Sequence, residues 1–548
     1  MKKALSLLLV IALLITSMTF LSSCELFEKS DKNEKKESGF ASGKGTEEEP
    51  YIISNAKQLK NLAKKLNDKD TYPDYADKYY KLSADIDLAG EEWEPINNGY
   101  DTNHFFKGVF DGDGYTVSNF KITNTTYESV GLFGSVSGTV KNLNVTQFEI
   151  NFTHNDEQYR SVGGVVGILG GEAPCLENCT AEGEINATSN GVLLVGGVVG
   201  RTYSYGDLPL TTIKNCGSKV TVTAESTIEN GHFESVGLKC GAFVGSLGTT
   251  TVSNCWADAT VKATSKTHGS TVGIFAGSAG GSLLRDCFAT GKAEMIRLAQ
   301  DENQAYRAGY LGGLCGDASY SNLKIERSSF DGDLIATGIG NLYVGGLVGS
   351  MDGSITDSYA TGTIKMSGDG VFSYSNNNGG FAGGLVGVVS YKVELINCYA
   401  ANTIKALYTE NYLSVGGLIG GTSGSSFDPI LLKNCFSAAN ITANCVVTDP
   451  SLPTFHYDKL LVGGIMGKYH YAEEIVNVYL TEGQTILGIY NSQECPSTDL
   501  DKNFPVAESS LLHSAYFYMN TLSWDKTVWD LSNLGSYPTL LSKPQINN

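Results

Sequence analysis

Six aromatic residues stand at equivalent places in a repeating pattern and could bind a ligand. A row of exposed rings could stack on sugar rings or form the main contacts of a protein interface. The same rings could instead stack on one another, or lie beneath loops, and only stabilise the fold. The residues are Trp256, Phe288, Tyr359, Tyr399, Phe436 and Tyr479.

Recognisable catalytic motifs are missing from the sequence. The histidines form no HExxH zinc site, and there is neither a phosphate-binding loop nor a GxSxG nucleophile elbow. Carboxylate pairs such as Asp331 and Asp333, or Glu473 and Glu474, could serve sugar hydrolysis. A chain with 58 acidic residues contains such pairs by chance. We therefore predict a protein without catalytic residues, metal ions or cofactors.

Two further groups of residues invite a chemical interpretation. The acidic run from Asp111 to Gly114 offers oxygen ligands for calcium, but it lacks the other ligands of an EF-hand loop, so we favour a tight turn. Six cysteines share one repeat position, where two other repeats carry Ser328 and Ser358. Serine can replace a small buried side chain but not a disulfide partner, which favours free packed thiols, with Cys175 and Cys179 as the best candidates for a bridge. The six are Cys179, Cys216, Cys255, Cys287, Cys398 and Cys435.

All of these residues are positioned by a repeat, seen most clearly as VGGLVG at 344–349. Near-copies recur through the chain at intervals of 32 to 47 residues, which indicates a repeat architecture with joining loops of variable length. The last glycines of the ten copies are Gly134, Gly167, Gly200, Gly245, Gly277, Gly316, Gly349, Gly387, Gly420 and Gly467.

A second constant segment follows each copy, for example LINCYAANTIKA at 395–406. Counted from Cys398, small or apolar residues alternate with polar or aromatic ones, with Asn402 as an exception, and this period of two predicts a strand with one buried face. The residue after the cysteine should therefore face outward. Asn or Asp before the cysteine suits a tight bend with left-handed backbone. These bend residues are Asn178, Asn215, Asn254, Asp286, Asp357, Asn397 and Asn434.

Together the two segments predict an all-β fold, a right-handed parallel β-helix with about ten rungs. Neighbouring rungs should lie about 4.8 Å apart, with asparagine stacked on asparagine at one corner. The rung at 325–336 breaks the pattern, because Arg327 stands at the bend, Ser329 at the aromatic place and Phe330 on the inward face.

The glycine, leucine, apolar, glycine unit resembles the GLUG-motif repeats of bacterial surface proteins, over roughly residues 105 to 480. The resemblance implies a β-helical region that is displayed on the cell surface and is often adhesive or accessory. It does not imply an enzyme, and the peptidase motif that accompanies the repeats in some relatives is missing here.

The first 24 residues have the features of an export signal: Lys2 and Lys3, then an apolar run, then Leu-Ser-Ser-Cys ending at Cys24. This ending resembles a bacterial lipobox, which implies cleavage before Cys24 and acylation of its thiol, so that the protein is anchored to a bacterial membrane by lipid. An ordinary secretory signal is the alternative. Residues 25–50 are charged and predict a flexible linker.

The remaining boundaries place caps at both ends of the solenoid. Residues 51–104 form the N-terminal cap, in which Ser54 or Asn55 begins a helix that buries Leu59, Leu62, Ala63 and Leu66. The repeats occupy 105–480. Residues 481–548 form a C-terminal cap, with Trp524, Trp529 and Tyr537 sealing the open end.

A net charge of −19 argues against nucleic acid as a partner, because the chain would repel phosphate groups. The sequence thus predicts an extracytoplasmic, lipid-anchored adhesin or binding scaffold for polysaccharide or surface protein. A polysaccharide lyase or glycoside hydrolase built on a β-helix, and a purely structural surface protein, are the alternatives. An enzyme would need a groove lined by carboxylates with Lys or Arg.

Overall fold

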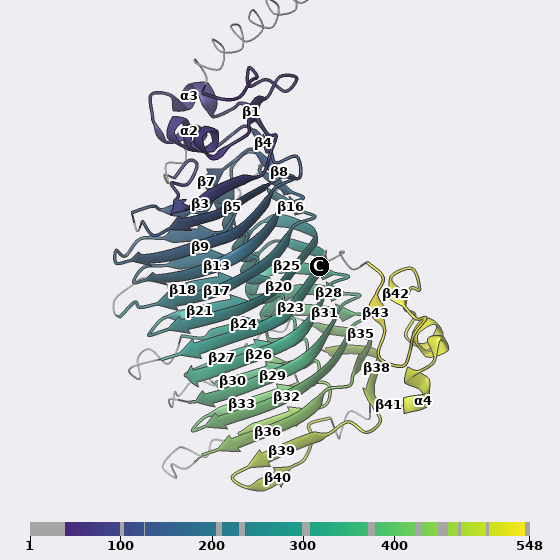
Figure 1. Ribbon diagram of the computed structural model, residues 1–548. Coiled ribbons are helices and arrows are strands. Elements are labelled where there is room, and N and C mark those ends of the chain that lie inside the picture. The colour runs from purple at the N-terminus through teal and green to yellow at the C-terminus, as the bar shows by residue number, and fades with distance from the viewer. Residues whose placement is uncertain are drawn as a thin grey trace, which may run out of the picture.

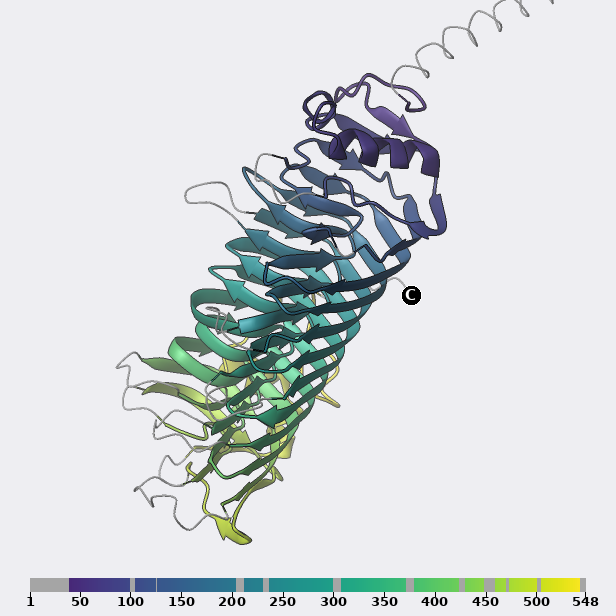
Figure 2. The same cartoon turned by 90° about the vertical axis from the view of Figure 1, so that its left-hand side faces the viewer.

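The computed structural model describes residues 39–98, 104–124, 126–203, 211–229, 236–298, 307–370, 379–422, 429–447, 459–469, 473–499 and 504–542. The predicted signal 1–24, with Cys24, and linker residues 25–38 lie outside these ranges. The described chain is almost all β-structure, and successive turns stack in parallel into an elongated rod (Figures 1 and 2). This arrangement agrees with the predicted parallel β-solenoid.

Each turn has three faces, here called A, B and C in chain order. Face A is a separate sheet of ten parallel strands. Its strands are β6 (Ser129–Val130), β10 (Arg160–Gly163), β14 (Leu193–Gly196), β18 (Val236–Gly241), β21 (Gly269–Gly273), β24 (Gly309–Gly312), β27 (Leu342–Gly345), β30 (Gly379–Gly383), β33 (Tyr412–Gly416) and β37 (Leu460–Gly463).

Faces B and C belong to one sheet of 31 strands that continues around the corner between them. Face B contains β7 (Phe133–Val136), β8 (Thr139–Lys141), β11 (Val166–Gly170), β12 (Cys175–Glu177), β15 (Val199–Tyr203), β16 (Thr211–Lys214), β19 (Val244–Gly248), β22 (Ala276–Gly280), β25 (Cys315–Glu326), β28 (Val348–Thr356), β31 (Val386–Ile396) and β34 (Ile419–Thr422). Face C contains β9 (Asn144–His154), β13 (Thr180–Ser189), β17 (Gly217–Ser226), β26 (Ser329–Ile339), β29 (Tyr359–Asp369), β32 (Tyr399–Thr409), β36 (Asn440–Val446) and β39 (Ile486–Tyr490). Four strands run through the corner and serve both faces, namely β20 (Thr250–Ser265), β23 (Leu283–Arg297), β35 (Ile430–Ser437) and β38 (Glu473–Thr481).

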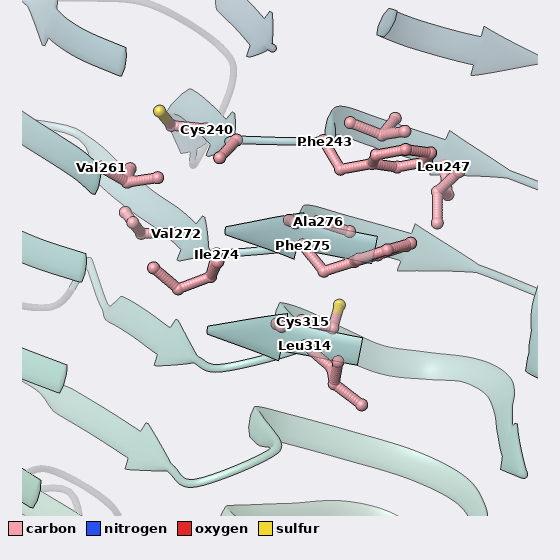
Figure 3. Close-up of a cluster of buried hydrophobic side chains, with 14 of the residues drawn as sticks. Cys240, Phe243, Leu247, Val261, Val272, Ile274, Phe275, Ala276, Leu314 and Cys315 are labelled. Carbon is pink, nitrogen blue, oxygen red and sulfur yellow. The ribbon is translucent and has the colours of Figure 1, made fainter. Parts of the chain in front are cut away.

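The glycines of each repeat lie at the corner between faces A and B, where the rod is narrow. A Cβ atom added at Gly346 would lie 2.0 Å from the carbonyl oxygen of Gly384 in the next turn, and one at Gly349 would lie 2.7 Å from the backbone nitrogen of Leu311 across the interior. Neither position has room for a side chain. The apolar residue between the glycines fills the core, as Figure 3 shows for Phe243 and Phe275, whose rings stack with centroids 4.5 Å apart.

The N-terminal end of the rod is covered by α2 (Ala56–Asn67) and α3 (Tyr72–Tyr75), which stand beside the first strands (Figure 2). The side chain of Asn55 accepts a hydrogen bond from the Gln58 N–H at 3.1 Å, so Asn55 is the N-cap of α2. The buried residues of α2 are Leu59, Leu62, Ala63 and Leu66. The strands that lead into the solenoid are β1 (Tyr51–Ile53), β2 (Tyr79–Leu82), β3 (Ile86–Glu92), β4 (Val109–Asp111) and β5 (Thr116–Ile122).

The folded part begins earlier than the predicted boundary at residue 51. Phe40 is buried, and its ring stacks on Tyr51 with centroids 4.7 Å apart. The N–H of Ala41 donates to the carbonyl of Ile52 at 2.9 Å. Residues 39–50, which we predicted to be flexible linker, therefore belong to the cap. The charge of the segment hid the effect of Phe40, whose burial among tyrosines acts together with the backbone bonds to Ile52 to hold the chain.

The opposite end is closed by an antiparallel pair of β39 with β40 (Gln493–Cys495) and by Asp499. In earlier turns the N–H of the second motif glycine donates to the next turn, as Gly417 does to the carbonyl of Gly463 at 3.0 Å. The last turn has no successor. There the carboxylate of Asp499 accepts from the N–H groups of Gly464 and Ile465 and supplies the missing acceptor.

Candidate functional site

The six predicted aromatic residues form one column, here called the aromatic ladder, on the outside of the B/C corner. Strand register pairs Trp256 with Phe288, and the column continues through Ser329 to the other four. Tyr399 lies 4.9 Å from Tyr359 on one side and 4.9 Å from Phe436 on the other, with ring planes within 5°. The predicted outward orientation is correct, because these rings pack in a cluster separate from the solenoid core.

The predicted exposure of the ladder is wrong. Phe288, Tyr359, Tyr399 and Phe436 are buried, whereas Trp256 and Tyr479 are half-buried. Residues 505–541 cover them. Each ring that leaves water contributes about 1.5 to 3 kcal/mol, so a continuous strip of rings is a strong docking surface for the chain's own C-terminal segment.

The C-terminal segment is fixed to the ladder by ring contacts and by hydrogen bonds. The hydroxyl of Tyr399 donates to the carbonyl of Pro538 at 2.7 Å, and the indole N–H of Trp524 donates to the carbonyl of Asn434 at 2.9 Å. Trp524 also stacks on Trp529, with ring centroids 4.2 Å apart. The segment contains β41 (Val506–Ala507), α4 (Ser509–Leu512), the π-helix η2 (Phe517–Thr521), β42 (Trp529–Asp530) and β43 (Thr539–Leu540).

This placement corrects the predicted C-terminal cap. Trp524, Trp529 and Tyr537 do not seal the open end of the rod but lie along its flank beside β31, β35 and β38, as the yellow segment in Figure 1 shows. The composition of the C-terminal segment does not show whether it covers the end of the rod or its flank. The outward-facing rings of the ladder provide the apolar surface on the flank to which it binds.

The asparagine corner beside the ladder has the predicted geometry. Its residues have left-handed backbone, with φ of 52° at Asn254 and 56° at Asn397. The side-chain amide of Asn254 donates to the side-chain oxygen of Asn215 at 2.8 Å, and that of Asn434 donates to Asn397 at 3.1 Å. Each turn is thus hydrogen-bonded to the one before it through equivalent side chains.

The irregular rung at 325–336 changes this ladder of amides into an ion pair. Arg327 donates from Nε and Nη2 to the carboxylate of Asp286, both at 2.8 Å. Asp357, in the next turn, accepts from the amide of Asn397 at 2.9 Å and from the indole of Trp529 at 3.4 Å. The acidic positions of the corner are therefore also where the C-terminal segment is held.

The cysteines at the repeat position are free thiols, and so are all the other cysteines of the described chain. Cys179, Cys216 and Cys398 each donate a backbone N–H, at 3.4 Å, to the sulfur at the same position one turn on. In the same way, the backbone N–H of Cys287 donates to the hydroxyl of Ser328, one turn on, at 3.0 Å. Burial raises the pKa of the Cys287 thiol to about 12, so this sulfur is a poor nucleophile.

A second aromatic group, missed by the sequence analysis, lies on face B. Tyr320 and Tyr391, here called the tyrosine pair, have 75% and 48% of their surface exposed, and their ring centroids lie 6.3 Å apart. Both stand on insertions. Strand β28 lies between β25 and β31 in the sheet, and it has a single residue, Asp352, between two paired positions. At the same place β25 has the four residues 319–322, and β31 has the three residues 390–392.

The backbone of Tyr320 is left-handed, with φ of 54°. This conformation costs a non-glycine residue about 1 to 2 kcal/mol. Because the Tyr320 side chain is exposed, its burial does not offset this cost. The residue therefore does not stabilise the fold, which suggests a role in binding. In the sequence, the uneven spacing of the repeats was the one indication of these insertions. It shows where extra residues lie but not how they fold.

Polar groups lie at the base of the tyrosine pair. The Asp317 carboxylate accepts from both the N–H and the hydroxyl of Ser319, and that hydroxyl lies 2.7 Å from the Ser350 hydroxyl. Burial raises the pKa of Asp317. These groups bond to one another and hold the insertion in place, and the two exposed rings above them can stack on a sugar ring.

Other candidate sites are accounted for by local contacts. The Asp111 carboxylate accepts from the N–H of Asp113 and from the amide of Asn142, both at 2.9 Å, as a turn does. No group of three or more metal-binding side chains occurs among the described residues. Within the same residues, no helix has the length and apolar character needed to cross a membrane.

Comparisons with known proteins agree with the repeat pattern. The family model for the GLUG motif matches residues 340–365. The chain is 32% identical over 169 residues to halomucin of Haloquadratum walsbyi, which covers 29% of this chain and 2% of halomucin. It is 37% identical over 109 residues to a "Putative Gly-rich membrane protein" of Evansella cellulosilytica, which covers 20% of this chain and 12% of the relative. These matches span only a small part of either relative.

Among solved structures, the chain resembles a crystal structure of a "putative immunoglobulin A1 protease" from Bacteroides ovatus. The alignment covers 92% of this chain and 96% of that one at 18% identity, with a TM-score of 0.28, and supports no argument about function. The family match and the stacked copies of its motif make the chain a GLUG-motif repeat protein.

Proposed function

We propose that this protein is a lipid-anchored β-solenoid of the bacterial cell surface that binds glycans through the tyrosine pair and has no enzymatic activity. The lipobox-like end of the signal at Cys24 supports the anchor. Similarity to proteins named as a halomucin and a membrane protein supports a surface location. The rod would then carry its binding face away from the membrane.

The observation that carries this proposal is the exposure of the tyrosine pair on two insertions of face B. The ladder cannot serve as the binding surface while the C-terminal segment covers it. Tyr320 and Tyr391 expose their side chains to solvent, and the half-buried Ser319 is the neighbour of Tyr320 in the chain. A net charge of −19 favours a neutral ligand over an anionic polymer.

A glycan array followed by affinity measurements tests the proposal. The protein would be produced as residues 25–548, without the lipid. The double variant Tyr320→Ala/Tyr391→Ala should bind the selected glycan about 5-fold to 150-fold more weakly, because each stacking contact contributes roughly 0.5 to 1.5 kcal/mol.

Tyr516→Ala is the matched control, because Tyr516 is 69% exposed but lies on the C-terminal segment. It should bind like the unchanged protein. Equal binding by the double variant and the unchanged protein would show that the tyrosine pair is not the site. If the protein binds no glycan but captures a protein ligand, the proposed glycan ligand is wrong and the protein is an adhesin for proteins.

A further inference from the structure

Inside the solenoid, near the corner where face C leads to face A, one inward-facing column is polar. Ser226, Ser265 and Arg297 occupy the same register position in three successive turns. Ser270 faces the same interior from face A, one turn before Gly309. All four polar residues are at most 2% exposed. This column therefore places hydrogen-bond donors next to a largely apolar interior.

The guanidinium of Arg297 has no counter-ion among the described residues. Its Nη1 donates to the carbonyls of Ile339 at 2.9 Å and Asn341 at 3.5 Å, while Nε has no hydrogen-bond partner. Burial lowers the pKa of Arg297 to about 10. The side chain therefore stays protonated at neutral pH, and a buried charge without a partner is among the most costly features a protein interior can hold.

The three serine hydroxyls are also unpaired. The Oγ atoms of Ser226, Ser265 and Ser270 are buried and have no hydrogen-bond partner within the described ranges. Buried polar groups are almost always paired, so several unpaired donors on neighbouring turns indicate that a bound species satisfies them. The lack of a side chain at Gly309 makes room for Arg297, since a Cβ atom there would lie 2.6 Å from Arg297 Cδ.

We propose that a small monovalent anion, such as chloride, binds inside the solenoid against the Arg297 guanidinium and the hydroxyls of Ser265 and Ser270. One negative charge balances the single guanidinium, and the serines can only add neutral O–H donors. Water could satisfy the hydroxyls but would leave the charge uncompensated. A divalent oxyanion such as sulfate would bring more charge than the site can balance.

The anion should stabilise the fold, because it binds the folded chain only. At constant ionic strength, replacing sodium gluconate with sodium chloride should raise the Tm by about 2 °C or more. The double variant Ser265→Ala/Ser270→Ala keeps the column small and should lose most of this rise. Arg160→Met is the matched control: Arg160 is also a buried arginine, but it pairs with Asp156 at 2.6 Å, so its loss should leave the chloride effect intact.

Bromide provides the direct test. Crystals of the protein grown in sodium bromide should show an anomalous peak beside Arg297 that is missing in the double serine variant. A chloride-independent Tm together with no bromide peak would overturn the proposal. So would a chloride effect that appears only after Asp301→Asn/Glu302→Gln, because a carboxylate of that loop, which lies outside the described residues, would then be the natural counter-ion.

Discussion

The aromatic ladder and the tyrosine pair both face outward, yet one is covered and the other is exposed. The ladder occupies a position that recurs in successive turns, so its rings join into one apolar strip that the C-terminal segment buries. The tyrosine pair stands on insertions in β25 and β31 and forms no such strip. The recurring position thus packs against the rest of the chain, whereas the two insertions leave their rings exposed to solvent.

The largest effect should come from uncovering the ladder. Trp524→Ala removes a 2% exposed side chain that stacks on Trp529 and bonds to Asn434. We expect a loss of about 3 to 5 kcal/mol in the free energy of unfolding, measured by urea titration. Tyr516→Ala, on the same segment, should change it by less than about 0.5 kcal/mol. Similar losses for both variants would mean that the segment does not dock on the ladder.

A smaller effect should distinguish the asparagine corner from the insertion in β25. Asn397→Ala loses two ladder hydrogen bonds and places alanine at φ of 56°, for a cost of about 2 to 3 kcal/mol. Asn397→Gly keeps the backbone and should cost about 1 kcal/mol less. Asn322 has φ of 51° in the exposed insertion, so Asn322→Ala should cost only the backbone term, about 1 kcal/mol.

Thermal unfolding of these three variants would check the ranking. Equal costs for Asn397→Ala and Asn322→Ala would show that the ladder bonds contribute nothing beyond the bend.

The smallest effect should have the opposite sign. Tyr320→Gly relieves the left-handed strain at φ of 54° and should stabilise the protein by about 0.5 kcal/mol, after the entropy cost of glycine, while weakening glycan binding. Tyr391→Gly has no such strain to relieve and should destabilise by about 1 kcal/mol. Calorimetry combined with glycan titration measures both. A clear loss of stability in Tyr320→Gly would mean that Tyr320 is a structural residue.

The repeated parts of the fold could be predicted from the sequence. Ten glycine motifs, and an Asn or Asp before the repeat-position cysteine, give the corners and the inward face, because one physical requirement recurs in each copy. Phe40, Asp499 and the C-terminal tryptophans each act once, in contacts between distant segments. Tyr320 stayed hidden because insertions vary the spacing without any pattern that shows how they fold.

Hydroxyl-radical footprinting with mass spectrometry tests the central comparison most directly. Oxidation rates follow solvent exposure of the rings in the folded protein. The account predicts fast oxidation of Tyr320 and Tyr391, and strong protection of Tyr359, Tyr399 and Phe436, with protection of the tyrosine pair once glycan is added. Rapid oxidation of the ladder rings in the unliganded protein, at the rate of Tyr320, would contradict it.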